Sequence, residues 1–161
     1  MPSILDLCHE LPETRYEAGA TLLDEGEQTG KLYILVDGRI EIVKGAFQVY
    51  FTSEPGSVFG EISALLDIPH TATVKTATVC RLYVVDKADE FLRSRPDIAY
   101  HLSRLLAQRL QSVTSYLVDL KEQFEDQQDH LGMVDEVLES ILHQQDETFL
   151  PGSDRYPDTK I

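Results

Sequence analysis

The chain has 161 residues, of which 42% are hydrophobic, and its formal net charge is −14. This length fits one domain with a modest extension, and the apolar content is high enough for a hydrophobic core, which excludes wholesale disorder. The negative charge argues against direct contact with nucleic acid or an anionic membrane, because no basic patch in the sequence offsets it.

The first two-thirds of the chain are typical of a mainly β fold. Residues 2–11 predict a short opening helix, and residues 14–86 then form short apolar runs separated by glycine turns. Asp37–Gly38 stands between two β-rich runs and predicts a tight hairpin, because a two-residue turn requires positive φ. Many short strands of this kind predict a double-stranded β-helix, that is, a jelly-roll barrel with flanking helices.

The apolar period changes to that of helices after residue 86. Residues 86–94 predict a short helix with Asp86 as its N-cap, and Pro96 stands where a long helix can begin. Apolar residues in this long helix recur at alternating spacings of four and three, which predicts the coiled-coil seam of a homodimer. The seam residues are Leu106, Leu110, Val113, Leu117, Leu120 and Phe124. The alternative is an amphipathic helix that packs onto the chain's own barrel.

The same apolar repeat continues beyond Leu131, but Gly132 interrupts it. A glycine inside a helix costs about 1 kcal/mol relative to alanine, so a break is expected there. The predicted segments are a barrel with short helices over 1–95, a dimerisation helix over 96–131, a short acidic helix over 132–146 and a mobile tail over 147–161. Two arrangements stay open: the helix after Gly132 continues the coiled coil, or it folds back.

The most informative segment is residues 59–74, which read FGEISALLDIPHTATV. Gly60 allows the backbone to approach a ligand closely. The amides of Ile62, Ser63 and Ala64 would form the first turn of a short helix, where unpaired N–H groups and the helix dipole favour an anion. An ordinary turn followed by a helix start has a similar sequence, so the flanking strands are needed to support the functional interpretation.

This segment resembles the phosphate-binding cassette of the cyclic nucleotide-binding domain family, whose usual form is close to F-G-E-[LIM]-[SA]-x-[LI]-(x)3-P-R-[STA]-A-T-V. The spacing from Glu61 to His70 matches that pattern without insertion or deletion. Upstream, residues 17–19, 25–26 and 33–38 fall where the family places its barrel glycines and a Y-x-[IVL]-x-x-G strand. The resemblance extends from the first helix to about residue 118.

The resemblance implies a ligand, cyclic AMP or cyclic GMP without preference, and no cofactor. Glu61 would accept hydrogen bonds from a ribose hydroxyl, and Thr71 would reach the phosphate or, in some relatives, the guanine amino group. Thr114 and Ser115 lie on the long helix where related dimeric regulators place base contacts. The implied ligand-binding residues are Gly60, Glu61, Ile62, Ser63, His70, Thr71, Thr114 and Ser115.

One position departs from the family pattern, because His70 replaces the arginine that pairs with the cyclic phosphate. A charge-assisted pair of this kind contributes about 1.5–3 kcal/mol. We therefore expect binding that is weaker by roughly tenfold to a hundredfold. A histidine supplies the charge only when it is protonated, near pH ~6.5, so binding would also depend on pH. The alternative is a ligand-free dimerisation and protein-interaction module with a vestigial pocket.

Other functions find no support in the sequence. The five histidines are scattered without metal spacing, and no nucleophile motif or P-loop is present, so we expect neither an enzyme nor a metal site. Relatives in the catabolite-activator group carry a helix-turn-helix after the dimer helix, but residues 132–145 contain no Lys or Arg. The expected protein is a stand-alone sensor that acts through a homodimer and an unidentified protein partner, without direct DNA binding.

The expected location is the cytoplasm. No apolar run approaches the length of a membrane span, which is about 18–20 residues. The N-terminus lacks the basic segment followed by an apolar segment that a signal peptide has. The two cysteines, Cys8 and Cys80, are far apart in the sequence and suit buried free thiols in a reducing compartment.

Overall fold

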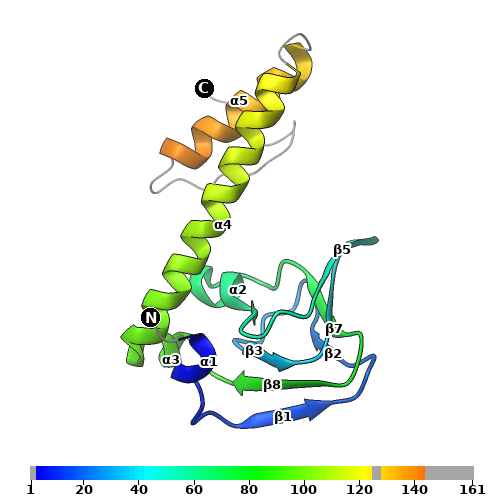
Figure 1. Ribbon diagram of the computed structural model, residues 1–161, viewed down its shortest axis with the longest axis vertical. Helices are drawn as coiled ribbons and strands as arrows, with labels where there is room; N and C mark the ends of the chain where they lie inside the picture. The colour runs from blue at the N-terminus through cyan, green and yellow to red at the C-terminus, as the bar shows by residue number, and fades with distance from the viewer. Residues whose placement is uncertain (1–2, 125–127, 144–161) are drawn as a thin grey trace. The chain divides into compact units, whose positions relative to one another are not determined.

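The computed structural model describes residues 3–124 and 128–143. The chain divides into two compact units, Met1–Leu102 and Ser103–Ile161. The first unit contains two four-stranded antiparallel sheets with short helices beside them (Figure 1). Its elements, in chain order, are α1 (Ile4–Leu7), β1 (Glu13–Tyr16), β2 (Thr21–Leu23), β3 (Leu32–Asp37), β4 (Ile40–Lys44), β5 (Phe47–Thr52), β6 (Val58–Phe59), α2 (Glu61–Leu66), β7 (Thr73–Thr76), β8 (Cys80–Val85) and α3 (Ala88–Ser94).

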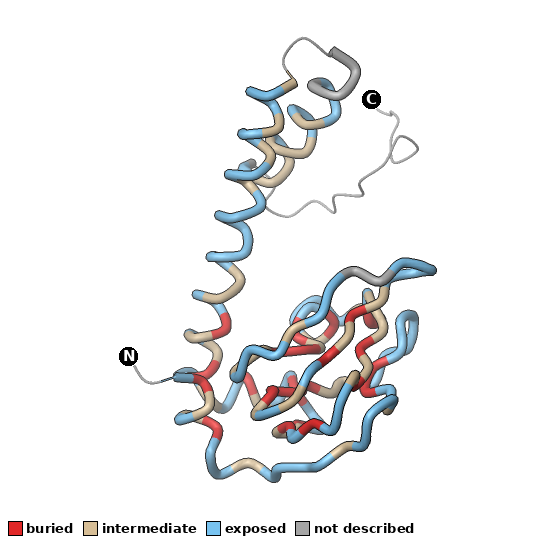
Figure 2. The backbone as a smooth tube through the Cα atoms, turned by 45° about the vertical axis from the view of Figure 1, so that its right-hand side comes forward, coloured by how far each residue is buried: buried red, intermediate tan, exposed pale blue. Residues whose placement is uncertain are grey.

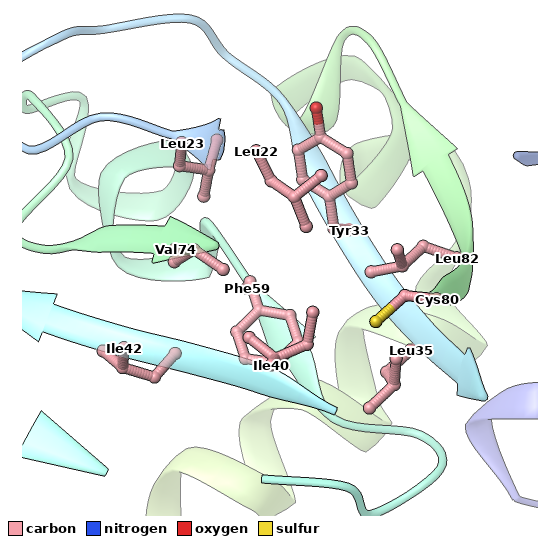
Figure 3. Close-up of a cluster of buried hydrophobic side chains, with 10 residues drawn as sticks. All are labelled: Leu22, Leu23, Tyr33, Leu35, Ile40, Ile42, Phe59, Val74, Cys80 and Leu82. Carbon is pink, nitrogen blue, oxygen red and sulfur yellow. The ribbon is translucent and has the colours of Figure 1, made fainter. Parts of the chain in front are cut away.

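The two sheets have the strand orders β1-β8-β3-β6 and β2-β7-β4-β5. Side chains from both sheets form one hydrophobic core, which Figure 3 shows in close-up. The core consists of Leu22, Leu23, Tyr33, Leu35, Ile40, Ile42, Phe59, Val74, Cys80 and Leu82. Figure 2 shows the buried residues in red along the backbone, and they are concentrated in the first unit. The mainly β fold class with flanking helices is thereby confirmed.

The predicted hairpin at Asp37–Gly38 is wrong. Strands β3 and β4 exist on either side of it, but β3 pairs with β6 and β8 whereas β4 pairs with β5 and β7. The two residues therefore form a corner at which the chain passes from one sheet to the other. Gly38 has a φ of +116°, and a Cβ there would lie 2.5 Å from the Cys80 Sγ. The glycine is required by its positive φ and by the close packing against β8. A glycine at such a corner has the same local sequence pattern as a glycine in a hairpin turn.

The predicted helices differ from the observed ones mainly at their ends. α1 is short, and Ser3 caps it by accepting from the Asp6 amide while the Asp6 carboxylate accepts from the Ser3 amide. The N-cap of α3 is Lys87 rather than Asp86. The long helix α4 (Pro96–Gln123) begins at Pro96 as predicted. Cys8 and Cys80 are both free thiols and both buried.

The second unit contains most of α4 and a further helix, α5 (Gln128–His143). Gly132 lies inside α5 rather than at a break. α5 lies beside the last turns of α4 in both Figure 1 and Figure 2, and the Lys121 Nζ is 2.5 Å from the Asp135 Oδ1. The second helix therefore folds back along the first. Residues 147–161, for which a tail is expected, lie outside the described residues.

The seam residues of α4 differ in burial along the helix. Leu110 and Val113 are 47% and 49% exposed, whereas Leu117, Leu120 and Phe124 are half-buried. The half-buried apolar residues of α5, Val134, Val137, Leu138 and Ile141, recur at helical spacing and form one face of that helix. The distal part of the α4 stripe thus packs within the chain. No helix among the described residues combines the length and the hydropathy that a bilayer crossing requires.

A substitution at the corner tests the packing argument. Gly38→Ala should lower the free energy of unfolding by about 2–4 kcal/mol, because strained φ and overpacking against Cys80 both contribute. Gly19→Ala is the matched control, since Gly19 has a φ of +86° but a Cβ added there would have nothing within 4 Å. Urea unfolding of both variants measures the difference, and equal losses would contradict a close approach at Gly38.

Candidate functional site

The segment that resembles a phosphate-binding cassette begins at Gly60, directly after β6. Gly60 has a φ of +93° and is the N-cap residue of α2. A Cβ at this position would overlap the Lys31 carbonyl oxygen, which belongs to the loop before β3. Only glycine fits both the left-handed backbone and this close approach. The glycine of the family pattern is therefore also required by the packing of this chain.

The first three residues of the helix α2 differ in burial. Glu61 and Ser63 are 5% and 4% exposed, whereas Ile62 is 41% exposed. The Ser63 hydroxyl donates to the Ile68 carbonyl, and the Ile68 amide donates to the Ser63 carbonyl at 3.2 Å. Ser63 thus closes the turn that ends α2. The Glu61 carboxylate lies at the start of α2, where the dipole of a helix favours negative charge.

The last residues of the segment lie along the loop between β2 and β3. The Gly26 amide donates to the His70 carbonyl at 2.9 Å, and the His70 amide donates to the Glu27 carbonyl at 2.8 Å. The Gln28 side chain donates to the Asp67 carboxylate at 2.8 Å. These bonds hold two loops that are about forty residues apart in the sequence in a fixed relation.

His70 is buried in this contact, with 4% of its surface exposed. Its Nε2 is 2.8 Å from the Thr29 hydroxyl oxygen. Burial lowers the pKa of the imidazole, and the neighbouring charge of Glu27 opposes that effect only in part. The neutral form is therefore favoured more than in an exposed histidine. The expected contact between His70 and a phosphate stays a prediction.

Thr71 is the next residue, and it is exposed. Its carbonyl accepts a hydrogen bond from the Lys44 Nζ at 2.6 Å. Sequence reasoning missed both Lys44 and Thr29, because neither belongs to the family pattern. The feature that could have identified Lys44 is the pairing of β4 with β7, in which the last pair is Val43 opposite Thr73. That register places Lys44 beside the end of the cassette.

The predicted base contacts, Thr114 and Ser115, belong to the second unit. Thr114 is half-buried and Ser115 is exposed on α4. Their place in the ligand-binding set stays a prediction, whereas Gly60, Glu61, Ser63 and the residues after Pro69 belong to one continuous segment of the first unit. Within the described ranges, no three His, Cys, Asp or Glu side chains are grouped as a metal site would require.

Residues 13–93 match a family model, that of the cyclic nucleotide-binding domain. One curated relative is the CRP-like cAMP-activated global transcriptional regulator of Mycobacterium tuberculosis, which is 30% identical over 124 residues; the match covers 73% of this chain and 55% of the relative. Another is the cAMP-dependent protein kinase regulatory subunit of Yarrowia lipolytica, 31% identical over 77 residues, with coverages of 48% and 20%.

A similar fold occurs in the crystal structure of the Thermus thermophilus Catabolite Activator Protein. The TM-score is 0.61 at 23% identity, and the match covers 75% of this chain and 60% of that one. The chain spans about half the length of the first curated relatives that it matches.

The burial of His70 predicts a pH-dependent stability. Because the folded-state pKa is lowered, the unfolded chain binds more protons between that pKa and about 6.5, so stability should fall as the pH falls through this window. We expect the difference in unfolding free energy between wild type and His70→Gln to be constant above about pH 7 and to decrease below it. Thr29→Val keeps the buried imidazole, so its free energy of unfolding should depend on pH as that of the wild type does.

Chemical denaturation at a series of pH values from 8 to 5 measures this effect. Comparing each variant with the wild type removes the contribution of the carboxylates, which titrate in all of the proteins. A difference that does not change with pH would mean that His70 titrates as it does in the unfolded chain.

Proposed function

The chain belongs to the cyclic nucleotide-binding domain family, and on this premise we propose that it is a regulatory sensor domain that binds cyclic AMP or cyclic GMP at the cassette. The observation that carries the proposal is the geometry of residues 60–63. There, a glycine with positive φ brings the backbone close to the neighbouring loop, and a buried glutamate follows it at the start of α2. Both features agree with the glycine and the ribose-binding glutamate of the family pattern.

The proposed binding is weak because the cassette lacks the arginine of the family. His70 is buried against Thr29, and the lowering of its pKa favours the uncharged imidazole. A neutral donor stabilises an anion less than a guanidinium does. Affinity should therefore increase at lower pH, where protonation adds charge to the cassette. Two curated relatives are described as cAMP-activated and cAMP-dependent, which supports a cyclic nucleotide as the ligand class.

We also propose that the sensor is not catalytic and acts as a homodimer on an unidentified protein partner in the cytoplasm. The exposure of Leu110 and Val113 on α4 supports the dimer, because two large apolar side chains at a spacing of three form a contact stripe. The distal seam residues Leu117, Leu120 and Phe124 are half-buried, so the dimer contact should centre on the exposed Leu110 and Val113 and include the half-buried Leu106 one turn before them. Direct DNA binding is not part of this proposal.

A second candidate is a dimerisation and protein-interaction module without a ligand. The observation that favours it is the engagement of Ser63 and His70 in hydrogen bonds within the chain. A cassette whose polar side chains are already hydrogen-bonded within the chain can be stable without a bound ligand. Titration with nucleotides separates the two candidates.

Thermal and chemical unfolding with nucleotide tests the sensor. With cyclic AMP or cyclic GMP at about a hundredfold above its dissociation constant, the free energy of unfolding should rise by about 2.7 kcal/mol. His70→Arg restores the charge of the family pattern and should tighten binding by roughly tenfold to a hundredfold in calorimetric titration. If neither nucleotide binds wild type or His70→Arg, the ligand-free module is the correct interpretation.

Light scattering tests the dimer. The double substitution of Leu110 and Val113 by Asp places charge at two exposed positions of the stripe, and the mass of the particle should fall from two chains to one. Val118→Asp is the control, because Val118 is 41% exposed but lies on a different side of α4 from Val113. A double variant with the mass of the wild-type particle would remove Leu110 and Val113 from the interface.

A further inference from the structure

The cassette contains no residue with a permanent positive charge. Residues 59–74 include no Lys or Arg, and the loop that lies along them contributes Asp24, Glu25 and Glu27. His70 is buried and bonded to Thr29. An anionic ligand at this place would meet acidic side chains unless a cation approaches from another element of the fold.

Lys44 approaches the cassette from β4. Ile40 and Ile42 are buried in the core, and alternate residues of a strand lie on the same face of a sheet, so Lys44 continues the inward face of β4 at the strand's end, where it is exposed. The register of β4 with β7 is unbroken from Ile40–Thr76 to Val43–Thr73. Lys44 therefore stands at the end of the inward face, next to the residues that join the cassette to β7.

The ammonium group of Lys44 reaches the cassette itself. Its Nζ donates to the carbonyl of Thr71, the residue that follows His70, at 2.6 Å. The nearby Glu25 carboxylate accepts instead from the Gly45 amide at 2.8 Å. In the part of the chain that the structure describes, Lys44 forms no ion pair. An ammonium group has three N–H donors, so donors remain for an anion beside Thr71.

We propose that Lys44 supplies the positive charge that holds the cyclic phosphate, in place of the arginine that the cassette lacks. This inference rests on the proposed nucleotide binding at the same site. A lysine is a point charge on a flexible four-carbon stem, so it can turn from the Thr71 carbonyl to a bound phosphate without a change in the backbone. Strand β4 is already linked to the cassette by the bond from Lys44 to the Thr71 carbonyl, and the bound phosphate would add a second partner for the same ammonium group.

Calorimetric titration of cyclic AMP into matched variants of the full chain tests this role. Lys44→Gln keeps a side-chain N–H donor but removes the charge, and it should weaken binding by roughly tenfold to a hundredfold. Lys44→Arg keeps the charge and should bind within about threefold of wild type. Lys75→Gln is the control, because it makes the same change in net charge on β7. Val74 and Thr76 face the core, so Lys75 lies on the other face of the strand. This variant should also bind cyclic AMP within about threefold of wild type.

The outcomes separate this inference from the function on which it rests. If wild type binds neither cyclic AMP nor cyclic GMP, the nucleotide site and the role of Lys44 both fail. If wild type binds and Lys44→Gln binds equally well, the site is correct and the role of Lys44 is wrong. Equal losses in Lys44→Gln and Lys75→Gln would assign the effect to the net charge of the domain, which also overturns a specific contact.

Discussion

The contact between the loop of residues 24–29 and the end of the cassette determines the shape of the candidate site. Backbone hydrogen bonds join Gly26 and Glu27 to His70, and the buried imidazole is hydrogen-bonded to the Thr29 hydroxyl of the first loop. A neutral, hydrogen-bonded ring suits this buried position better than a guanidinium, because burying a charge without a paired partner costs several kcal/mol. The residue that departs from the family pattern is therefore part of the structure that supports the cassette.

Net charge is a poor guide to the ligand of such a site. The chain carries a formal charge of −14, which opposes an anion at long range. Exposed charges are screened beyond about 8 Å at physiological ionic strength, so the groups within a few ångströms of the phosphate decide the affinity. In the proposed site these groups are the amides of Ile62 and Ser63 at the start of α2 and the Lys44 ammonium, which bonds to the Thr71 carbonyl. The Ala64 amide, which the sequence also predicts there, donates instead to the Gly60 carbonyl at 3.1 Å.

The apolar stripe of α4 differs in burial along its length. Its distal residues, Leu117, Leu120 and Phe124, are half-buried where α5 folds back, and the Lys121–Asp135 ion pair lies beside them. Leu110 and Val113 stay exposed nearer the start of the helix. A heptad repeat thus does not by itself distinguish a helix of the same chain from a helix of a second copy, because both partners present the same apolar surface.

Local sequence patterns determined most of the strands, though not β1 or β6, the start of α4 at Pro96 and the family of the chain. Apolar period and the glycine–glutamate spacing are properties of neighbouring residues. The tertiary structure alone decided that Asp37–Gly38 is a corner between sheets, that α5 folds back, that His70 is buried against Thr29 and that Lys44 reaches Thr71. Each of these depends on strand pairing or helix packing between distant segments. Such contacts are set by how the whole core is filled, and no local pattern encodes them.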